Sequence, residues 1–315
     1  MTKKIKTILA GILTAGMLIS ATACTATDAA TTTTAAATTT TTTAAAAATT
    51  AKATETTAAA AATEAATASL SGSLVLTGST SMADVTTALA EAFMAANGDV
   101  TVSVGGNGSG EGPTAVNDGT AQIGLLSRDL KAEETPEAFD KVIIGYDGIA
   151  VIVNAASGVD SLTTDQITQI FSGKITNWKD VGGVDSKIQC IGREAASGTR
   201  TAFEELMKVK DLAVYSEEQN STGNVKQAVS ANPNAIGYVS LTSVDTTVVA
   251  VKLDGIVPSE ETVKTGEYTL QRPFVMITKA GTTDALAKAF LDYVFSDAGM
   301  KIVADDGVVP NPGRS

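Results

Sequence analysis

The sequence of 315 residues has no histidine, two cysteines, one tryptophan and few aromatic residues of any kind. The lack of histidine excludes a Ser-His-Asp triad, a histidine-based metal site and imidazole acid–base catalysis. Serines are therefore expected to donate hydrogen bonds rather than to attack a substrate, and we predict a protein that is not an enzyme and uses no metal or cofactor. Basic residues are also scarce, 22 against 34 acidic ones, which gives a net charge of −12. This balance argues against nucleic acid as a partner and requires any anion site to be made attractive locally.

The N-terminus has the pattern of an export signal. Three lysines precede an apolar run at 8–19, and small residues at 20–23 lead into Cys24. The run is too short to span a bilayer comfortably. A cysteine at this place resembles a bacterial lipobox, so we predict a lipoprotein signal peptide at 1–23 and a lipid, such as palmitate, on Cys24. The alternative is a plain secretory signal followed by a chance cysteine.

Residues 24–68 are almost wholly alanine and threonine. Such a segment cannot bury enough apolar surface to offset its ordering entropy, so we predict a disordered tether. The remaining 69–315 are long enough for two modest lobes. Cys190 has no partner for an internal disulfide there and is expected to be a buried strand residue.

The body alternates strand and helix patterns. Strands are expected at 74–76, 100–104, 123–126, 142–146, 149–153, 188–191, 237–241, 248–251 and 274–278, and helices at 82–96, from about 113, at 201–209 and at 286–294. The first helix is expected to begin at Ser81, with Asp84 completing its cap. This alternation predicts an α/β fold with a mainly parallel sheet, whose ligands bind at the carboxyl ends of strands.

Three loops rich in Gly, Ser and Thr each follow a predicted strand and precede a predicted helix. They lie at 78–81, 106–110 and 193–200, and the last begins with Arg193. Helix starts present free N–H groups and partial positive charge, which favour an oxyanion. Each loop alone is more typical of an ordinary turn, but the three together with Arg193 indicate an anion site. The acidic neighbours Glu133-Glu134 and Glu204-Glu205 point apart on a helix and are expected to be solvated.

Six motifs occur in the order seen in one family. They are Thr77-Gly78-Ser79-Thr80-Ser81, residues 123–128, residues 146–154, residues 169–178, residues 193–200 and Ala235-Ile236-Gly237-Tyr238-Val239. In them the chain resembles the substrate-binding lipoproteins of bacterial phosphate ABC importers. The resemblance implies a two-lobe, periplasmic-binding-protein-like fold of type II with the ligand in the interlobe cleft. Lobe one is expected at 69–153 and 274–315 and lobe two at 154–273, with crossings near Val153-Asn154 and Arg272-Pro273.

The resemblance also implies the contacts to phosphate. They are Thr80, Ser81, Ser109 and Ser127 from lobe one, and Arg193, Ser197, Gly198 and Thr199 from lobe two. The better-known form of the family has an aspartate after the serine of the Ser127 motif, where it accepts the proton of hydrogen phosphate, but here the residue is Arg128. Asp147 and then Asp129 are the candidates for that acceptor, although Asp147 is equally typical of a turn cap.

The resemblance implies an extracellular receptor that captures inorganic phosphate and delivers it to a permease and ATPase complex. The lipid on Cys24 would hold it at the outer face of a cell membrane, as in a Gram-positive bacterium. One alternative is a receptor for another oxyanion such as sulfate or molybdate. Others are a surface or adhesion lipoprotein, which leaves Arg193 unexplained, and a phosphatase, which the lack of histidine opposes.

Overall fold

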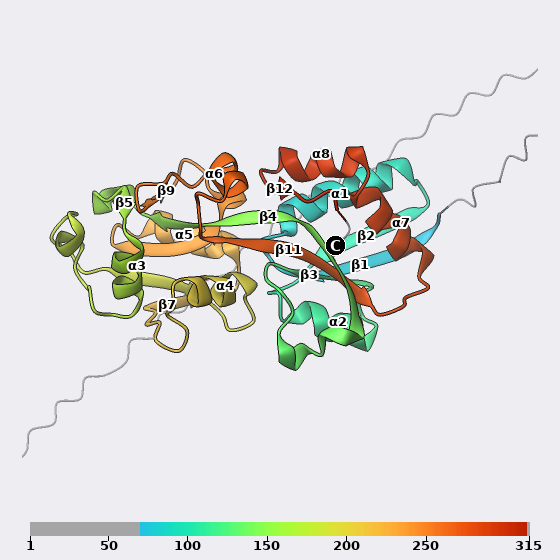
Figure 1. Ribbon diagram of the computed structural model, residues 1–315, viewed down its shortest axis with the longest axis horizontal. Helices are drawn as coiled ribbons and strands as arrows, with labels where there is room; N and C mark the ends of the chain where they lie inside the picture. The colour runs from blue at the N-terminus through green and yellow to red at the C-terminus, as the bar shows by residue number, and fades with distance from the viewer. Residues whose placement is uncertain (1–69, 314–315) are drawn as a thin grey trace, which may run out of the picture. The chain divides into compact units, whose positions relative to one another are not determined.

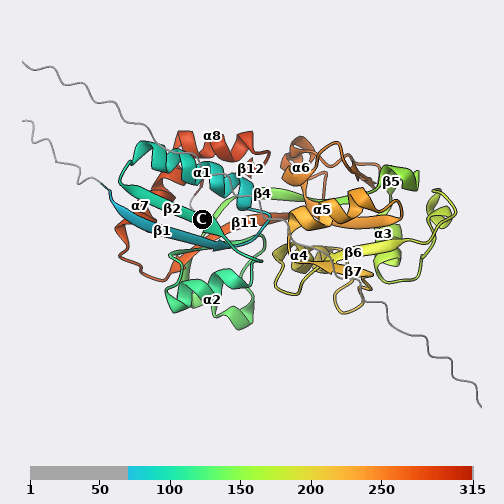
Figure 2. The ribbon, with the colours of Figure 1, turned by 180° about the vertical axis from the view of Figure 1, so that it is seen from behind.

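The computed structural model describes residues 70–313, which belong to one compact unit (Figures 1 and 2). The predicted signal peptide, Cys24 and the predicted tether lie outside the described residues. Within residues 70–313 no helix is both long and apolar enough to cross a bilayer.

The α/β fold predicted from the sequence is confirmed. The strands are β1 (Gly72–Gly78), β2 (Val100–Gly105), β3 (Ile123–Leu126), β4 (Phe139–Val153), β5 (Ser161–Leu162), β6 (Gln189–Arg193), β7 (Glu217–Gln219), β8 (Ala235–Ser240), β9 (Val249–Ala250), β10 (Lys252–Leu253), β11 (Gln271–Lys279) and β12 (Val309–Pro310). The helices are α1 (Ala83–Ala96), α2 (Glu111–Asp118), α3 (Thr164–Phe171), α4 (Gly198–Leu206), α5 (Thr222–Ala231), α6 (Glu260–Thr265), α7 (Ala285–Val294) and α8 (Asp297–Asp305).

The main sheet is mixed rather than mainly parallel. Its strands follow the order β2-β1-β3-β11-β4-β8-β6-β7. Strand β1 pairs parallel with β2 and β3, and β6 pairs parallel with β7 and β8. Strands β4 and β11, however, pair antiparallel with each other and with their other neighbours in this order. The expectation of a mainly parallel sheet is wrong at this centre, because β11 comes from the end of the chain and runs back along β4.

The two central strands connect two hydrophobic cores. Figure 1 shows β4 and β11 running side by side from the elements around α1, α2 and α7 to those around α3, α4 and α5. Ile144 of β4 and Phe274 of β11 pack in the first core with β1, β2 and α1. Ile149 and Val153 of β4 pack in the second core with α3 and α4. We call the elements around the first core the first half and those around the second core the second half.

The change from one core to the other falls within β4, between Ile144 and Ile149. We expected the first crossing near Val153-Asn154, and the packing places it several residues earlier. The sequence suggested two strands, at 142–146 and 149–153, but they are one continuous strand. The passage between the cores lies where the sequence suggested the boundary between these two strands, so the prediction placed it too late. Around the start of β11 the change falls between Leu270, which packs in the second core, and Phe274, which packs in the first.

Two scarce residues pack in the second core. Cys190 lies on β6 and is buried, as predicted. Trp178 is fully buried, and its indole nitrogen donates to the carbonyl of Asn234 at 3.1 Å. Both residues therefore serve the packing of this half.

Candidate functional site

Close backbone packing fixes the loops of the first half. Gly78 and Gly106 both have positive φ, at 138° and 126°. A Cβ at Gly106 would overlap the backbone nitrogen of Gly78, and Gly108 donates its N–H to the Gly78 carbonyl at 2.9 Å. Only glycine allows this close approach, so the loops after β1 and β2 pack directly against each other through their backbones.

Helix α1 begins without the cap that the sequence suggested. Its N-cap residue is Met82, which makes no side-chain cap bond, so the predicted start at Ser81 with Asp84 as its partner is wrong. The Ser81 hydroxyl bonds instead to Thr199 and to Thr222, each at 2.9 Å. Both partners belong to the other half. This hydroxyl is therefore directed away from its own helix and toward the site.

The loop after β6 supplies the second half's groups. Helix α4 begins at Gly198, three residues before the predicted start, because Ser197 is its N-cap and accepts the N–H of Arg200 at 3.2 Å. Gly198 and Thr199 thus lie in the first turn, where backbone N–H groups are free. The helix start faces the first half, since Gly110 donates its N–H to the Ala196 carbonyl at 3.0 Å.

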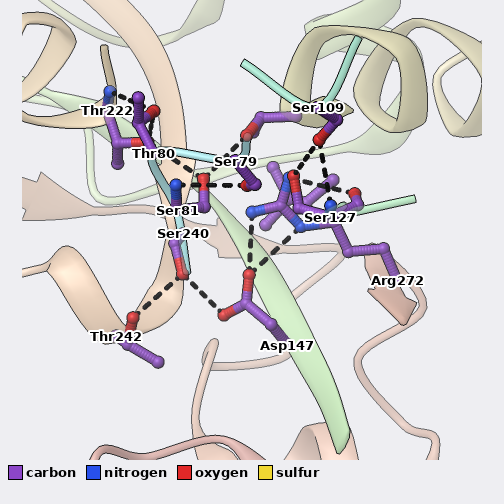
Figure 3. Close-up of polar contacts among 12 residues, drawn as sticks. Ser79, Thr80, Ser81, Ser109, Ser127, Asp147, Thr222, Ser240, Thr242 and Arg272 are labelled. Carbon is purple, nitrogen blue, oxygen red and sulfur yellow. Dashed lines mark hydrogen bonds and ion pairs between the residues drawn. The ribbon is translucent and has the colours of Figure 1, made fainter. Parts of the chain in front are cut away.

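Hydroxyl groups from both halves meet in one buried cluster (Figure 3). Thr80 and Thr222 share a hydrogen bond of 3.2 Å beside Ser81. Ser109 and Ser127 form a second pair at 3.3 Å, and the Ser127 N–H donates to the Ser109 hydroxyl at 3.0 Å. A Cβ on Gly198 would overlap the Ser109 hydroxyl and lie 2.7 Å from that of Ser127. The structure therefore gathers the predicted serines, threonines and Gly198 in one place.

Arg193 extends from β6 into this cluster and is 1% exposed. Its Nη2 donates to Thr80 at 3.1 Å and to the Asn220 carbonyl at 3.2 Å. Its Nη1 donates to Thr222 at 3.3 Å and its Nε to the Gln219 carbonyl at 3.2 Å. Every one of these acceptors is neutral.

The charge of Arg193 has no carboxylate partner. None of the ion pairs formed within residues 70–313 includes it. Burial is the main cause that lowers the pKa of Arg193 to about 10; the charge of Arg272 contributes to the lowering, while Tyr238 and Glu194 oppose it. A buried cation without a counter-ion is unfavourable by itself. This part of the structure is therefore suited to an anion.

Asp147 lies beside the cluster, on β4, in an ion pair with Arg272 of β11. Its Oδ2 accepts from Arg272 Nη2 at 2.8 Å and from Nε at 3.1 Å, and its Oδ1 accepts from the Ser240 hydroxyl at 2.8 Å (Figure 3). Burial raises the pKa of Asp147, and the neighbouring Arg272 opposes that rise. Each carboxylate oxygen thus already has a donor from the protein.

The other candidate acceptor, Asp129, is not brought to the cluster. Its side chain is 63% exposed and pairs with Lys141 at 2.9 Å. Arg128, at the position where the sequence departs from the better-known form, pairs with Glu134 at 2.6 Å. That glutamate and Glu204, which pairs with Arg200, are 15% and 12% exposed, so the expectation that they are solvated is wrong.

Most of the cluster is buried, and only Thr80 among its hydroxyl residues is half-buried. A surface groove of about 660 Å³ is lined by the segment 128–133, by helix α4 and by residues 271–273; Arg272 borders it, but none of the hydroxyls of the cluster does. Ser81, Ser109, Ser127 and Thr199 are each 5% exposed or less. The described residues contain no group of three or more side chains suited to a metal ion.

Three polar residues of the cluster and its border were not predicted as site residues. Thr222 opens α5 in the sequence Asn220-Ser221-Thr222-Gly223, the same kind of helix start as the predicted loops. It was missed because β7, with the sequence Glu-Glu-Gln, carries no apolar strand signal. Ser240 and Arg272 lie on buried strands and have no local motif to distinguish them.

The fold and the closed polar cluster define a periplasmic-binding-protein-like α/β protein. The family model described as the PBP superfamily domain matches residues 23–298. The phosphate-binding protein PstS of Bacillus subtilis (strain 168) is 38% identical over 248 residues, which cover 76% of this chain and 81% of that protein. PstS of Pseudomonas aeruginosa (strain PAO1) is 30% identical over 275 residues, 78% of this chain and 85% of that protein.

Solved structures give the same result. A Clostridium perfringens protein described as a phosphate ABC transporter substrate-binding protein with bound phosphate is 40% identical, with a TM-score of 0.74 over 76% of this chain and 100% of that one. An ABC-type phosphate transport receptor from Vibrio cholerae is 34% identical, with a TM-score of 0.64 over 76% and 100%. The chain belongs to the PstS family of phosphate-binding proteins.

Proposed function

We propose that this chain is the receptor of a phosphate ABC importer and binds inorganic phosphate without chemical conversion. The observation that carries the proposal is Arg193, a guanidinium that is 1% exposed, has no carboxylate partner in the described residues and is surrounded by neutral donors and acceptors. A dianion or monoanion beside it would supply the missing charge. A planar guanidinium can also bind two phosphate oxygens at once.

The remaining donors fit a tetrahedral oxyanion. We assign phosphate contacts to Thr80, Ser81, Ser109 and Ser127 from the first half and to Arg193, Ser197, Gly198 and Thr199 from the second. Hydroxyls and the free N–H groups at the start of α4 can approach an anion from several directions. The names of the relatives, which include phosphate-binding proteins and a transport receptor, favour phosphate over sulfate or molybdate.

The two halves act as lobes that close on the ligand. Each lobe supplies part of the donor set, so phosphate stabilises the closed arrangement over the open one. We place the hinge on β4 between Ile144 and Ile149 and on β11 near Arg272. Scattering with and without inorganic phosphate is expected to show compaction, and an identical profile with binding confirmed separately would contradict closure.

At the cell surface, the receptor would hand phosphate to a permease and its ATPase. We assign residues 1–23 to a lipoprotein signal peptide, Cys24 to the lipid anchor and 24–68 to a tether at the outer face of the membrane. The lipobox-like sequence before Cys24 supports this assignment. Mass spectrometry of the native N-terminus is expected to find a diacylated Cys24, and Cys24→Ala is expected to release the protein from membranes.

Calorimetry with phosphate, arsenate, sulfate and molybdate tests the binding function directly. Phosphate and arsenate share their geometry and protonation, so both are expected to bind, with phosphate at least tenfold tighter than sulfate and molybdate. Tighter binding of sulfate or molybdate would make this a receptor for another oxyanion. No binding of any of the four would favour a surface or adhesion lipoprotein.

A further inference from the structure

Arg272 is a second buried guanidinium at the border of the hydroxyl cluster. It lies on β11 where that strand passes from one half to the other, and its side chain is 1% exposed. Its Nη1 lies 3.5 Å from the Ser127 carbonyl, and Figure 3 shows the guanidinium between Asp147 and the Ser109-Ser127 pair. Arg272 is not among the phosphate contacts proposed for the two halves.

The two buried guanidiniums, Arg193 and Arg272, have one carboxylate in ion-pair contact between them, and it belongs to Arg272 alone. Asp147 pairs with Arg272, and no ion pair of the described residues involves Arg193, so the buried group carries one positive charge in excess. The two guanidiniums are close enough for Arg272 to lower the pKa of Arg193, after the larger effect of burial. An anion between the two arginines would relieve this repulsion.

Asp147 is arranged to orient Arg272. Its two oxygens accept from Ser240 Oγ, Arg272 Nη2 and Arg272 Nε, and these bonds hold the guanidinium in one plane. Nη1 is the nitrogen left outside the ion pair, and it points to Ser127 rather than to Asp147. To accept a proton from phosphate, Asp147 would have to give up one of the donors that it already has.

We propose that Arg272 binds the anion through Nη1 as a second guanidinium, and that Asp147 is a positioning residue for Arg272 rather than the acceptor of the phosphate proton. This inference rests on the proposed function. It also changes the expected basis of selectivity, because a guanidinium attracts phosphate and sulfate alike whereas a free carboxylate would repel sulfate.

Calorimetry on four variants with inorganic phosphate and with sulfate tests the assignment. Arg272→Gln is expected to weaken both anions by about 10- to 100-fold, the effect of losing one charge-assisted hydrogen bond. Asp147→Asn is expected to weaken both by about 3- to 10-fold, because Arg272 loses its orientation but keeps its charge. The double variant should bind no more weakly than Arg272→Gln alone, since residues that act through one contact are not additive.

Arg128→Gln is the matched control. Arg128 is also a buried guanidinium in an ion pair, 5% exposed and 2.6 Å from Glu134, but no hydrogen bond links it to the cluster. The phosphate affinity of the Arg128→Gln variant is expected to stay within about twofold of that of wild type. Melting each variant without ligand by circular dichroism separates a loss of folding from a loss of binding.

A crystal structure of the wild-type protein with inorganic phosphate tests the same contact without depending on the folding of any variant. Arg272 Nη1 within hydrogen-bond distance of a phosphate oxygen supports the assignment, and a separation above about 4 Å overturns it. A different result would make Asp147 the proton acceptor instead: Asp147→Asn loses the selectivity for phosphate over sulfate, while Arg272→Gln binds both anions as wild type does. If wild type binds no phosphate at all, the proposed function fails, which is a different outcome from a wild type that binds while Arg272→Gln keeps full affinity.

Discussion

The two halves contribute different chemistry to the site. The first half offers neutral hydroxyls, those of Thr80, Ser81, Ser109 and Ser127, on loops held together by backbone contacts between glycines. The second half offers the charge of Arg193 and the starts of α4 and α5. The difference teaches that shape and charge are divided: one half forms a rigid polar surface and the other brings the cation to it. Neither half alone holds the complete donor set.

The largest effect is expected from removing the charge of the second half. Arg193→Ala should cost about 2–4 kcal/mol of phosphate binding, because it removes a charge-assisted fork and leaves anion oxygens unpaired. Arg193→Lys should recover part of the loss, since it restores the charge without the planar fork. Calorimetry measures both.

Lys301→Ala is the control for net charge. Lys301 is 70% exposed and pairs with Asp305 on the surface of α8. It should bind phosphate as wild type does. Equal affinities for Arg193→Ala and Lys301→Ala would mean that the anion binds elsewhere.

The next largest effect concerns the contact between the halves. Gly198→Ala should weaken phosphate by about 1–3 kcal/mol, because the new methyl group meets the hydroxyls of Ser109 and Ser127 and opposes closure. Gly223→Ala is a matched control in the first turn of α5, where a Cβ has no atom within 4 Å. If both variants bind equally well, the closed contact at Gly198 does not occur in the bound state.

A single hydroxyl of the first half should matter less. Ser81→Ala removes the bonds to Thr199 and Thr222 and should weaken phosphate by about 1 kcal/mol. The control Ser73→Ala changes an exposed serine of the same half, on β1, and should not change the phosphate affinity. A loss as large as that of Arg193→Ala would contradict the division between charge and shape.

The smallest effect is a pH dependence of stability in the first half. Burial, with smaller contributions from Asp84 and Asp147, raises the pKa of Asp306 to about 6. The folded state then holds this proton more tightly than the unfolded state, so stability falls as pH rises toward 6. Asp306→Asn should raise the melting temperature at pH 7.5 and leave it unchanged near pH 4. Asp305→Asn, at an exposed neighbouring position, should not show this difference, and a gain confined to pH 4 would reverse the sign we assign.

Local patterns were sufficient for most elements. The predicted strands at 100–104, 123–126 and 188–191 correspond to β2, β3 and β6, and the last predicted helix to α7. Their apolar residues repeat with the period of the element that they form, so no distant contact is needed to recognise them. The three Gly, Ser and Thr loops were recognised for a similar reason, because helix starts have a composition of their own.

One error arose where a distant partner replaced a local one. Ser81 has the composition of an N-cap, yet its hydroxyl bonds across the site to Thr199 and Thr222. These partners are 118 and 141 positions away, so short-range sequence carries no information about them. Glu134 is a different case: its partner Arg128 lies only six positions earlier, and the prediction failed because it considered the neighbouring glutamate and not the nearby arginine.

The sequence by itself determined the alternation of strands and helices, the polar helix starts and the family to which the chain is similar. It also supplied Arg193, because an arginine that precedes a Ser-Gly-Thr helix start is a local signal. The tertiary structure decided that β4 and β11 pair antiparallel and that β4 passes from the first half to the second within its length. It also decided that Asp147 contacts Arg272 and Ser240. Asp147 is 125 positions from Arg272 and 93 positions from Ser240 in the sequence. These side chains can meet only after the strands have paired, because the sheet register sets which residues lie opposite one another. That register, rather than any motif, gives Arg272 its carboxylate partner.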